Sequence, residues 1–123
     1  MFGWFRDAIN WALALDRYSC QDFRQAVVRL EAIKGPRSKA SEYLALLGTA
    51  HIILNMPETA RAMIGKAKSG SSPTRASYRL YIQAYCDYYL SALEGDEGAK
   101  VKHLKRALRV DAPPIIRQWL PLS

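Results

Sequence analysis

Clusters of turn-forming residues divide the chain into segments of a length that suits helices. Apolar residues recur at helical spacing between the clusters, and no segment alternates apolar and polar residues as a half-buried strand does. Proline lies early in two segments, at Pro57 and Pro73, where the first turn of a helix accepts it. The pattern predicts an all-α protein with about six helices of roughly ten to eighteen residues and a short seventh helix in 113–120. The turn clusters are 17–22, 34–38, 54–57, 69–73, 94–98 and 111–114.

Size and composition indicate one globular domain spanning residues 1–123. The chain is long enough to form a core without disulfides or metal ions, and half of its residues are hydrophobic. Cys20 and Cys86 are too few for a disulfide framework, so we expect two buried free thiols, which suit a reducing cytoplasm. Charged residues interrupt the apolar stretch 1–18, and we expect neither a membrane span nor a signal peptide there. We therefore predict a cytoplasmic protein.

The sequence contains a repeat of helix-packing residues. The stretches 21–33 and 55–67 align at a spacing of 34 residues, and a looser third copy in 95–114 follows at a spacing of 40. The aligned pairs in the first two copies are Ala26 with Ala60, Leu30 with Ile64 and Ile33 with Ala67. Small residues at such positions allow close helix approach, and one hairpin alone leaves an apolar face uncovered. The repeat therefore predicts helical hairpins that stack on one another.

This pattern resembles the tetratricopeptide repeat, a 34-residue helix–turn–helix unit with small residues where its two helices touch. The resemblance covers about residues 7 to 112, and its turn residues include "QDF" at 21–23 and "GD" at 95–96, although Lys100 replaces the alanine expected in the third unit. The middle unit matches best, through Leu44, Leu47, Gly48, His51, Ala60, Ile64 and Ala67. The resemblance implies a right-handed stack of about three hairpins with a short C-terminal capping helix. The implied hairpins are 4–34, 38–69 and 73–110, with the cap at 112–120. A generic bundle of helical hairpins remains the alternative.

Five tyrosines occur in the segment 78–90, and on a helix they fall within roughly 100° of arc. So little polar surface remains on this helix that more than one side must be covered. In the resemblance, the first helices of successive hairpins line a concave groove. The groove positions that we assign to partner binding are Trp11, Leu15, Tyr18, Thr49, Ile52, Tyr78, Tyr81, Tyr85 and Tyr88.

The tyrosines permit two interpretations. As a groove floor they would bind an apolar partner segment, because tyrosine gives contact area at low entropic cost and can hydrogen-bond. In that case Tyr81 and Tyr85 should be partly accessible in the free protein. In the other interpretation a terminal helix fills the groove, and the tyrosines belong to the core.

The chain is basic, with a net charge of +7 and a pI near 9.6. Such a balance favours acidic proteins, nucleic acid or lipid headgroups as partners. In the predicted helix 100–110 we assign Val101, Leu104, Ala107 and Leu108 to the inner side. The opposite side is a basic docking face of Lys102, Lys105, Arg106 and Arg109. No aromatic residue interleaves these cations, so nucleic-acid binding is weakly supported, and a merely solvated face is the other interpretation.

The two ends of the chain are rich in aromatic and aliphatic residues. Phe2, Trp4, Phe5 and Trp11 give the N-terminal helix the composition of an interfacial membrane helix, but its charges balance. We expect this helix to cap the first hairpin and 115–120 to seal the last one. Peripheral membrane contact through the N-terminal helix stays an alternative.

Catalytic chemistry finds little support in the sequence. The only histidines are His51 and His103, and there is no glycine-rich phosphate loop and no spacing typical of metal ligands. A pair formed by a cysteine and a histidine remains open. We expect a non-enzyme without cofactor or metal, acting as a small adaptor or chaperone-like module that holds a protein or peptide segment, with acidic partners favoured by its charge. The alternative is a basic module that docks on nucleic acid or an anionic membrane. The sequence does not indicate the oligomeric state.

Overall fold

Seven α-helices and one 3₁₀ turn account for most of the residues that the computed structural model describes, 3–69 and 72–122. These residues contain no β-strand, and the prediction of an all-α protein is confirmed. The elements are α1 (Gly3–Ser19), α2 (Phe23–Glu31), η1 (Pro36–Lys39), α3 (Ser41–Ile53), α4 (Pro57–Lys68), α5 (Ala76–Glu94), α6 (Glu97–Arg109) and α7 (Pro114–Trp119). Phe2 and residues 70–71 of the turn predicted at 69–73 lie outside the described residues.

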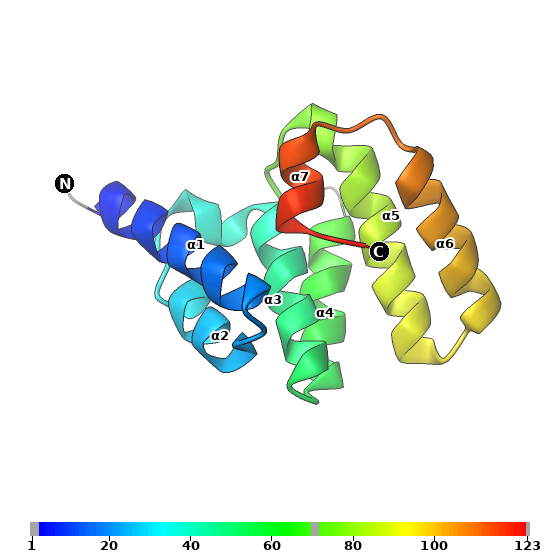
Figure 1. The fold of residues 1–123 in the computed structure, drawn as a ribbon, viewed down its shortest axis with the longest axis horizontal. Helices are drawn as coiled ribbons and strands as arrows, with labels where there is room; N and C mark the ends of the chain where they lie inside the picture. The colour runs from blue at the N-terminus through cyan, green and yellow to red at the C-terminus, as the bar shows by residue number, and fades with distance from the viewer. Residues whose placement is uncertain (1–2, 70–71, 123) are drawn as a thin grey trace.

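The six longer helices pack as consecutive pairs. α1 packs against α2, α3 against α4 and α5 against α6, while α2–α3 and α4–α5 contacts join the neighbouring pairs. Figure 1 shows the pairs in series, with α1 and α2 at the blue end, α3 and α4 in the middle and α5 and α6 at the yellow end. α3 is the central helix, because every residue from 41 to 51 is buried.

The turns inside the three pairs have the same backbone geometry. Each contains one residue in the left-handed region, namely Gln21 (φ 63°), Asn55 (φ 63°) and Gly95 (φ 74°). The next residue's amide donates to a carbonyl five residues earlier, as in a Schellman turn. These bonds are Asp22 to Arg17 (2.8 Å), Met56 to His51 (2.8 Å) and Asp96 to Ser91 (3.0 Å). The left-handed residues are 34 and 40 residues apart, which are the spacings of the sequence repeat.

Small residues bring the two helices of the middle pair together. Gly48 on α3 faces α4, where a Cβ atom at this position would lie 2.5 Å from Cγ1 of Ile64 and 3.3 Å from the carbonyl oxygen of Ala60. Ala60 and Ile64 are themselves fully buried. A glycine is therefore required here by the close approach of the helices rather than by backbone conformation.

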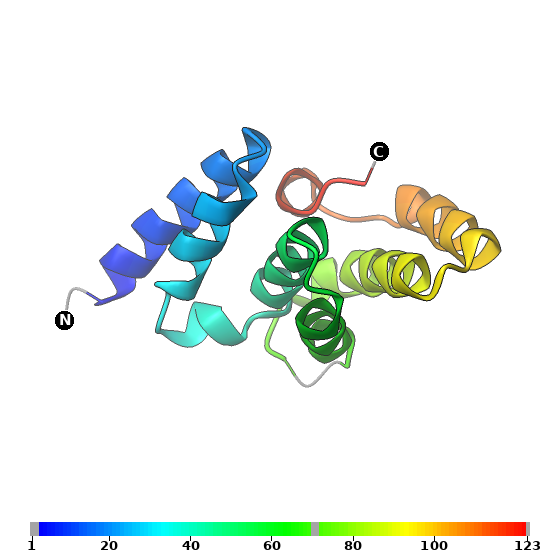
Figure 2. The ribbon, with the colours of Figure 1, turned by 90° about the horizontal axis from the view of Figure 1, so that it is seen from below.

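The C-terminal helix α7 lies on the side of the molecule formed by α1, α3 and α5. Figure 2 shows α7 end-on above α3, between the α1–α2 pair and α6. Its Trp119 meets the ring of Trp11 edge-to-face at 5.4 Å and the ring of Tyr78 at 6.1 Å. We expected this segment to seal the last hairpin, but it leaves the outer side of α6 uncovered, where Val101 and Leu108 are exposed.

Candidate partner-binding surfaces

The nine residues that we assigned to a groove are not an open surface. Tyr81 and Tyr85 are 1% and 0% exposed, so the interpretation as an open groove floor, under which both would be partly accessible, is wrong. The other interpretation, in which a terminal helix fills the groove and the tyrosines belong to the core, agrees with the structure. The residues divide into a buried set and a half-buried set. Trp11, Thr49, Tyr78, Tyr81 and Tyr85 are buried, whereas Leu15, Tyr18, Ile52 and Tyr88 are half-buried. The physical reason is that the tail of the chain, from α7 to Leu120, covers the middle of the groove.

The buried tyrosine hydroxyls have hydrogen-bond partners. The hydroxyl of Tyr85 lies 2.6 Å from Oγ1 of Thr49, which donates its own hydrogen to the carbonyl of Ala45 at 2.9 Å. The three groups Tyr85, Thr49 and the Ala45 carbonyl thus form one hydrogen-bonded chain inside the core. The hydroxyl of Tyr81 donates to the carbonyl of Leu120. Burial raises the pKa of Tyr81 to about 12 and that of Tyr85 well above its usual value, so both hydroxyls keep their protons at neutral pH.

Tyr88 is separated from the other groove residues. The ammonium group of Lys100 on α6 lies 5.7 Å from its ring centre, and the ring of Tyr89 meets it edge-to-face at 5.0 Å. Tyr88 thus contributes to the contact between α5 and α6 rather than to the surface that α7 covers. The helical spacing of the tyrosines could not separate it from the others, because α5 is covered on more than one side.

The groove is incompletely filled near its α1 wall. A hollow of about 290 Å³ remains between the end of α1 and the tail of the chain. Its lining residues are Leu15, Asp16, Tyr18, Ser19, Gln118, Trp119 and Pro121. Trp11, whose ring contacts the lining residue Trp119, is 5% exposed, and its indole nitrogen Nε1 has no hydrogen-bond acceptor among the described residues. The hollow and the unbonded indole N–H show that the tail neither fills the whole groove nor bonds to every polar group in it.

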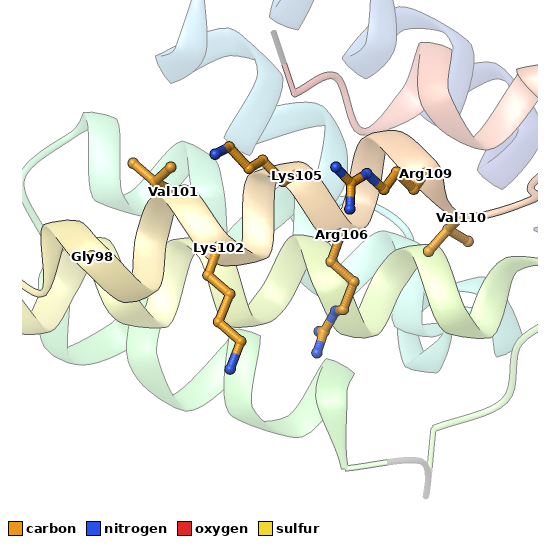
Figure 3. Close-up of a pocket in the computed structure, with 7 residues that line it drawn as sticks. All are labelled: Gly98, Val101, Lys102, Lys105, Arg106, Arg109 and Val110. Carbon is orange, nitrogen blue, oxygen red and sulfur yellow. The ribbon is translucent and has the colours of Figure 1, made fainter.

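The predicted basic face lies on the outer side of α6. Lys102, Lys105, Arg106 and Arg109 are all exposed, and they line a shallow hollow of about 660 Å³. We call this hollow the α6 surface, which consists of Gly98, Val101, Lys102, Lys105, Arg106, Arg109 and Val110 (Figure 3). Its volume exceeds those of three other hollows among the described residues, about 290, 540 and 340 Å³.

Two rows of side chains border the α6 surface, each with a spacing of four residues. Figure 3 shows Val101, Lys105 and Arg109 along one edge, with Lys102, Arg106 and Val110 along the other. Gly98 continues the second row without a side chain, so the hollow is open at that end. Rows of this spacing are the ridges of a helix, and the space between them is the groove into which a ridge of another helix packs.

The cations of the α6 surface differ in their partners. Arg106 donates to Oδ2 of Asp87 at 2.6 Å, and Lys68 lies 2.5 Å from Oδ1 of the same carboxylate, so this cluster joins α4, α5 and α6. Partial burial alone would raise the pKa of Asp87, but hydrogen bonds from Lys68 and Arg106 outweigh it and hold the pKa below its usual value. Within the described residues Lys102, Lys105 and Arg109 have no ion pair, and their charges face solvent.

Only part of the predicted apolar side of α6 faces inward. Ala107 is fully buried and Leu104 is half-buried, as predicted, whereas Val101 and Leu108 are 47% and 59% exposed. The row that faces inward is Ala99, His103 and Ala107, spaced by four residues, and its two alanines permit close packing on α5. The alanine spacing was the signal that could have revealed this orientation. Its consequence is that two aliphatic side chains stand beside the cations of the outer side.

The start of α1 exposes another apolar group. Trp4 is 74%, Phe5 54% and Ile9 45% exposed, and the first two rings meet edge-to-face at 5.8 Å. Asp7 on the same helix accepts hydrogen bonds from the backbone amides of Lys34 and Gly35 at 3.3 and 2.8 Å. This contact fixes α1 to the turn after α2, and peripheral membrane contact through the exposed rings stays a prediction. Among the described residues, no helix combines the length and apolar character needed to cross a membrane.

Among the described residues, no hydrogen bond joins a cysteine to a histidine. Cys20 is exposed, so the expectation that both thiols are buried is wrong for this residue. Cys86 is buried, and its burial raises the pKa of the thiol to about 12. His51 forms a 2.8 Å hydrogen bond between Nδ1 and the carbonyl of Leu47 in its own helix. In residues 3–69 and 72–122, no three His, Cys, Asp or Glu side chains gather as metal ligands do.

Comparison of the chain with protein-family models, with curated proteins and with solved structures gives no match.

Proposed function

We propose that this chain is a non-catalytic protein-interaction module, an adaptor built from about three stacked helical hairpins, and that it binds an acidic helical segment of a partner on the α6 surface. The observation that carries the proposal is the hollow between two ridges of α6, bordered by the unpaired cations Lys102, Lys105 and Arg109. A helix packed there would meet aliphatic side chains and positive charge at the same time.

A right-handed stack of the tetratricopeptide-repeat kind is part of this proposal. The three Schellman turns with left-handed residues at spacings of 34 and 40 support it, as does the contact between Gly48 and α4. In such a stack each hairpin covers an apolar face of the one before it. The outer side of α6 is where a following hairpin would pack, and exposed Val101 and Leu108 are the residues that it would cover.

The charge of the α6 surface selects the partner. Opposite charge speeds diffusional encounter and disfavours partners of the wrong sign, while apolar contacts supply most of the affinity. The partner segment should therefore be an amphipathic helix with Leu or Ile on one side and Asp or Glu on its flanks. We also propose a cytoplasmic location, which the exposed free thiol of Cys20 favours.

The test measures the binding of a designed acidic amphipathic helical peptide. The fluorescence anisotropy of the labelled peptide reports both the affinity and the association rate. Replacing Lys102, Lys105 and Arg109 with Gln should lower the association rate and reduce its dependence on salt. The matched control removes three exposed charges elsewhere, through Arg17→Gln, Arg24→Gln and Arg61→Gln, and should leave binding unchanged. Equal losses in both triple variants would contradict a site on α6.

The alternative function, a basic module on nucleic acid or an anionic membrane, is tested with the same variants. A DNA duplex and vesicles containing phosphatidylserine replace the peptide. Binding to phosphates should fall steeply with salt, because it depends on counterion release. Tight salt-dependent binding of either probe, without binding of the acidic peptide, would favour the alternative and reject the proposal.

A further inference from the structure

The tail of the chain occupies the aromatic groove with a small set of side chains. Ile116 and Leu120, four residues apart, are completely buried in the core cluster. Arg117 lies 4.9 Å from the ring centre of Tyr81 and donates hydrogen bonds to the carbonyls of Ala107, at 2.9 Å, and Val110. The tail thus presents an aliphatic pair and a cation on one short helix, as a bound peptide ligand would.

Trp119 completes this set of contacts. It lies between Trp11 of α1 and Tyr78 of α5, edge-to-face with both rings. Trp11 is also covered by the guanidinium of Arg37, 5.2 Å from its ring centre. Two helices that are distant in the sequence, α1 and α5, therefore converge on the side chain of Trp119. Aromatic anchors of this kind carry much of the binding energy in protein–peptide contacts.

The tail depends on the groove for its structure. α7 contains six residues, and a helix of this length is not stable in isolation. It follows Val110, whose backbone is extended, so it can leave the groove without disturbing the backbone hydrogen bonds within α6, although the bonds from Arg117 to Ala107 and Val110 would break. Release would expose the groove but would keep the three helix pairs. The segment belongs to the kind of structure that opens locally before the whole chain unfolds.

The tail does not fill the groove completely, and it leaves one polar group of the groove without a hydrogen bond. The indole N–H of Trp11 is buried without an acceptor, although Trp119 lies against its ring. A buried donor left without a partner is unfavourable, and an incoming segment that offers an oxygen atom would remove that cost. The hollow of about 290 Å³ between Leu15, Tyr18 and Trp119 shows in addition that the tail leaves part of the groove unfilled.

We infer that the groove of α1, α3 and α5 is a peptide-binding site that the chain's own tail occupies, and that a partner segment of similar chemistry binds by displacing the tail. The partner segment carries two large aliphatic residues four apart, an arginine for the ring of Tyr81, an aromatic anchor, and a carbonyl or carboxylate oxygen for Trp11. This site is distinct from the α6 surface, and its ligand is recognised through an arginine, whereas the ligand of the α6 surface is recognised through its carboxylates.

The first experiment measures binding of a fluorescent synthetic peptide with the sequence of residues 111–122. The wild-type chain should bind it weakly, because its groove is occupied, and Trp119→Ala should bind it at least tenfold more tightly, because the competent state is more populated. The double variant Trp11→Ala with Trp119→Ala also lacks the ring that the tryptophan of the peptide contacts, so the tighter binding should be lost.

The triple Gln variant of the α6 surface should bind the peptide like the wild-type chain, which separates this inference from the proposed function. Failure of Trp119→Ala to bind more tightly, with its far-UV circular dichroism unchanged, would overturn the inference.

The second experiment uses only the wild-type chain, so its result does not depend on whether a variant folds. Hydrogen exchange on the wild-type chain should show faster exchange at the amides of 116–120 than at those of α3, and saturating peptide should speed exchange at 116–120 further. Exchange at 116–120 that is as slow as in α3 would overturn the inference, because the tail would then open only with global unfolding. A concentration-dependent dimer with exchanged tails, seen by sedimentation, would also overturn it, because the groove's ligand would then be a second copy.

Discussion

Gly48 and Ile64 are in such close contact that a Cβ atom on Gly48 would lie 2.5 Å from Cγ1 of Ile64. Real Cβ atoms are not found at this distance from a neighbour, so any side chain at position 48 must displace Ile64 or separate α3 from α4. Ile64 is completely buried and cannot move into solvent without losing its own contacts. The spacing of the middle helix pair is therefore set by one glycine.

Gly48→Ala should destabilise the fold by about 1 to 3 kcal/mol, because overpacking strains a filled core. Gly65→Ala is the matched control on α4, since nothing lies within 4 Å of a Cβ atom there. It should stabilise the chain by ~0.5 to 1 kcal/mol, because alanine loses less backbone entropy in a helix than glycine. Urea denaturation of the two variants measures both values. Equal effects would show that the two glycines have the same surroundings and would contradict the close contact.

Substitutions at two of the left-handed turn residues should change the free energy of unfolding in opposite directions. Gln21 adopts φ 63° with a side chain that disfavours it, and Gln21→Gly should raise the free energy of unfolding by up to about 1 kcal/mol. Gly95→Ala, at φ 74°, should lower it by about 1 kcal/mol, although nothing lies within 4 Å of the added Cβ atom. Chemical denaturation checks both. A loss of stability in Gln21→Gly would mean that the side chain contributes more than the strain costs.

The carboxylate of Asp87 predicts how stability depends on pH. Its pKa is lower in the folded chain than the ~3.9 of an unfolded aspartate, so its contribution is present above that value and is lost as the pH falls through the folded-state pKa. Asp87→Asn should lower the free energy of unfolding by about 1 to 2 kcal/mol near neutral pH, and the two proteins should converge in strong acid. Thermal melts across this range measure the difference. Asp16→Asn, on the exposed side of α1, is the control and should change the free energy of unfolding little near neutral pH, because no ion pair among the described residues includes Asp16.

The fold class and the positions of close helix contact could be read from local patterns. Helical periodicity and turn clusters need only neighbouring residues, and Gly48 with Ala60 followed from small residues at helix-packing spacing. The orientation of α6 could not be read in the same way, because Val101 and Leu108 look like core residues when the outer side is unknown.

The tyrosine segment required a contact that no local pattern contains. Tyr81 bonds to Leu120, 39 residues later, and a stripe of tyrosines has the same spacing whether it lines a groove or a core. The composition of 115–120 predicted a covering segment, but not which side of the stack it covers. That choice depends on how Ile116, Trp119 and Leu120 fit between helices that are distant in the sequence.

Substitutions of Tyr85 test whether its ring is packed in the core of the protein in solution. It is completely buried and bonded to Thr49, so Tyr85→Ala should cost ~3 to 5 kcal/mol of unfolding free energy, as expected when a packed aromatic site is emptied. Tyr85→Phe should cost only about 1 kcal/mol, because it removes one hydrogen bond and keeps the ring. Tyr88→Ala is the matched control on the same helix and should cost less than Tyr85→Ala, since Tyr88 is half-buried. Melting curves of the three variants give this order. A Tyr85→Ala variant as stable as Tyr88→Ala would mean that the groove is open around Tyr85 in solution.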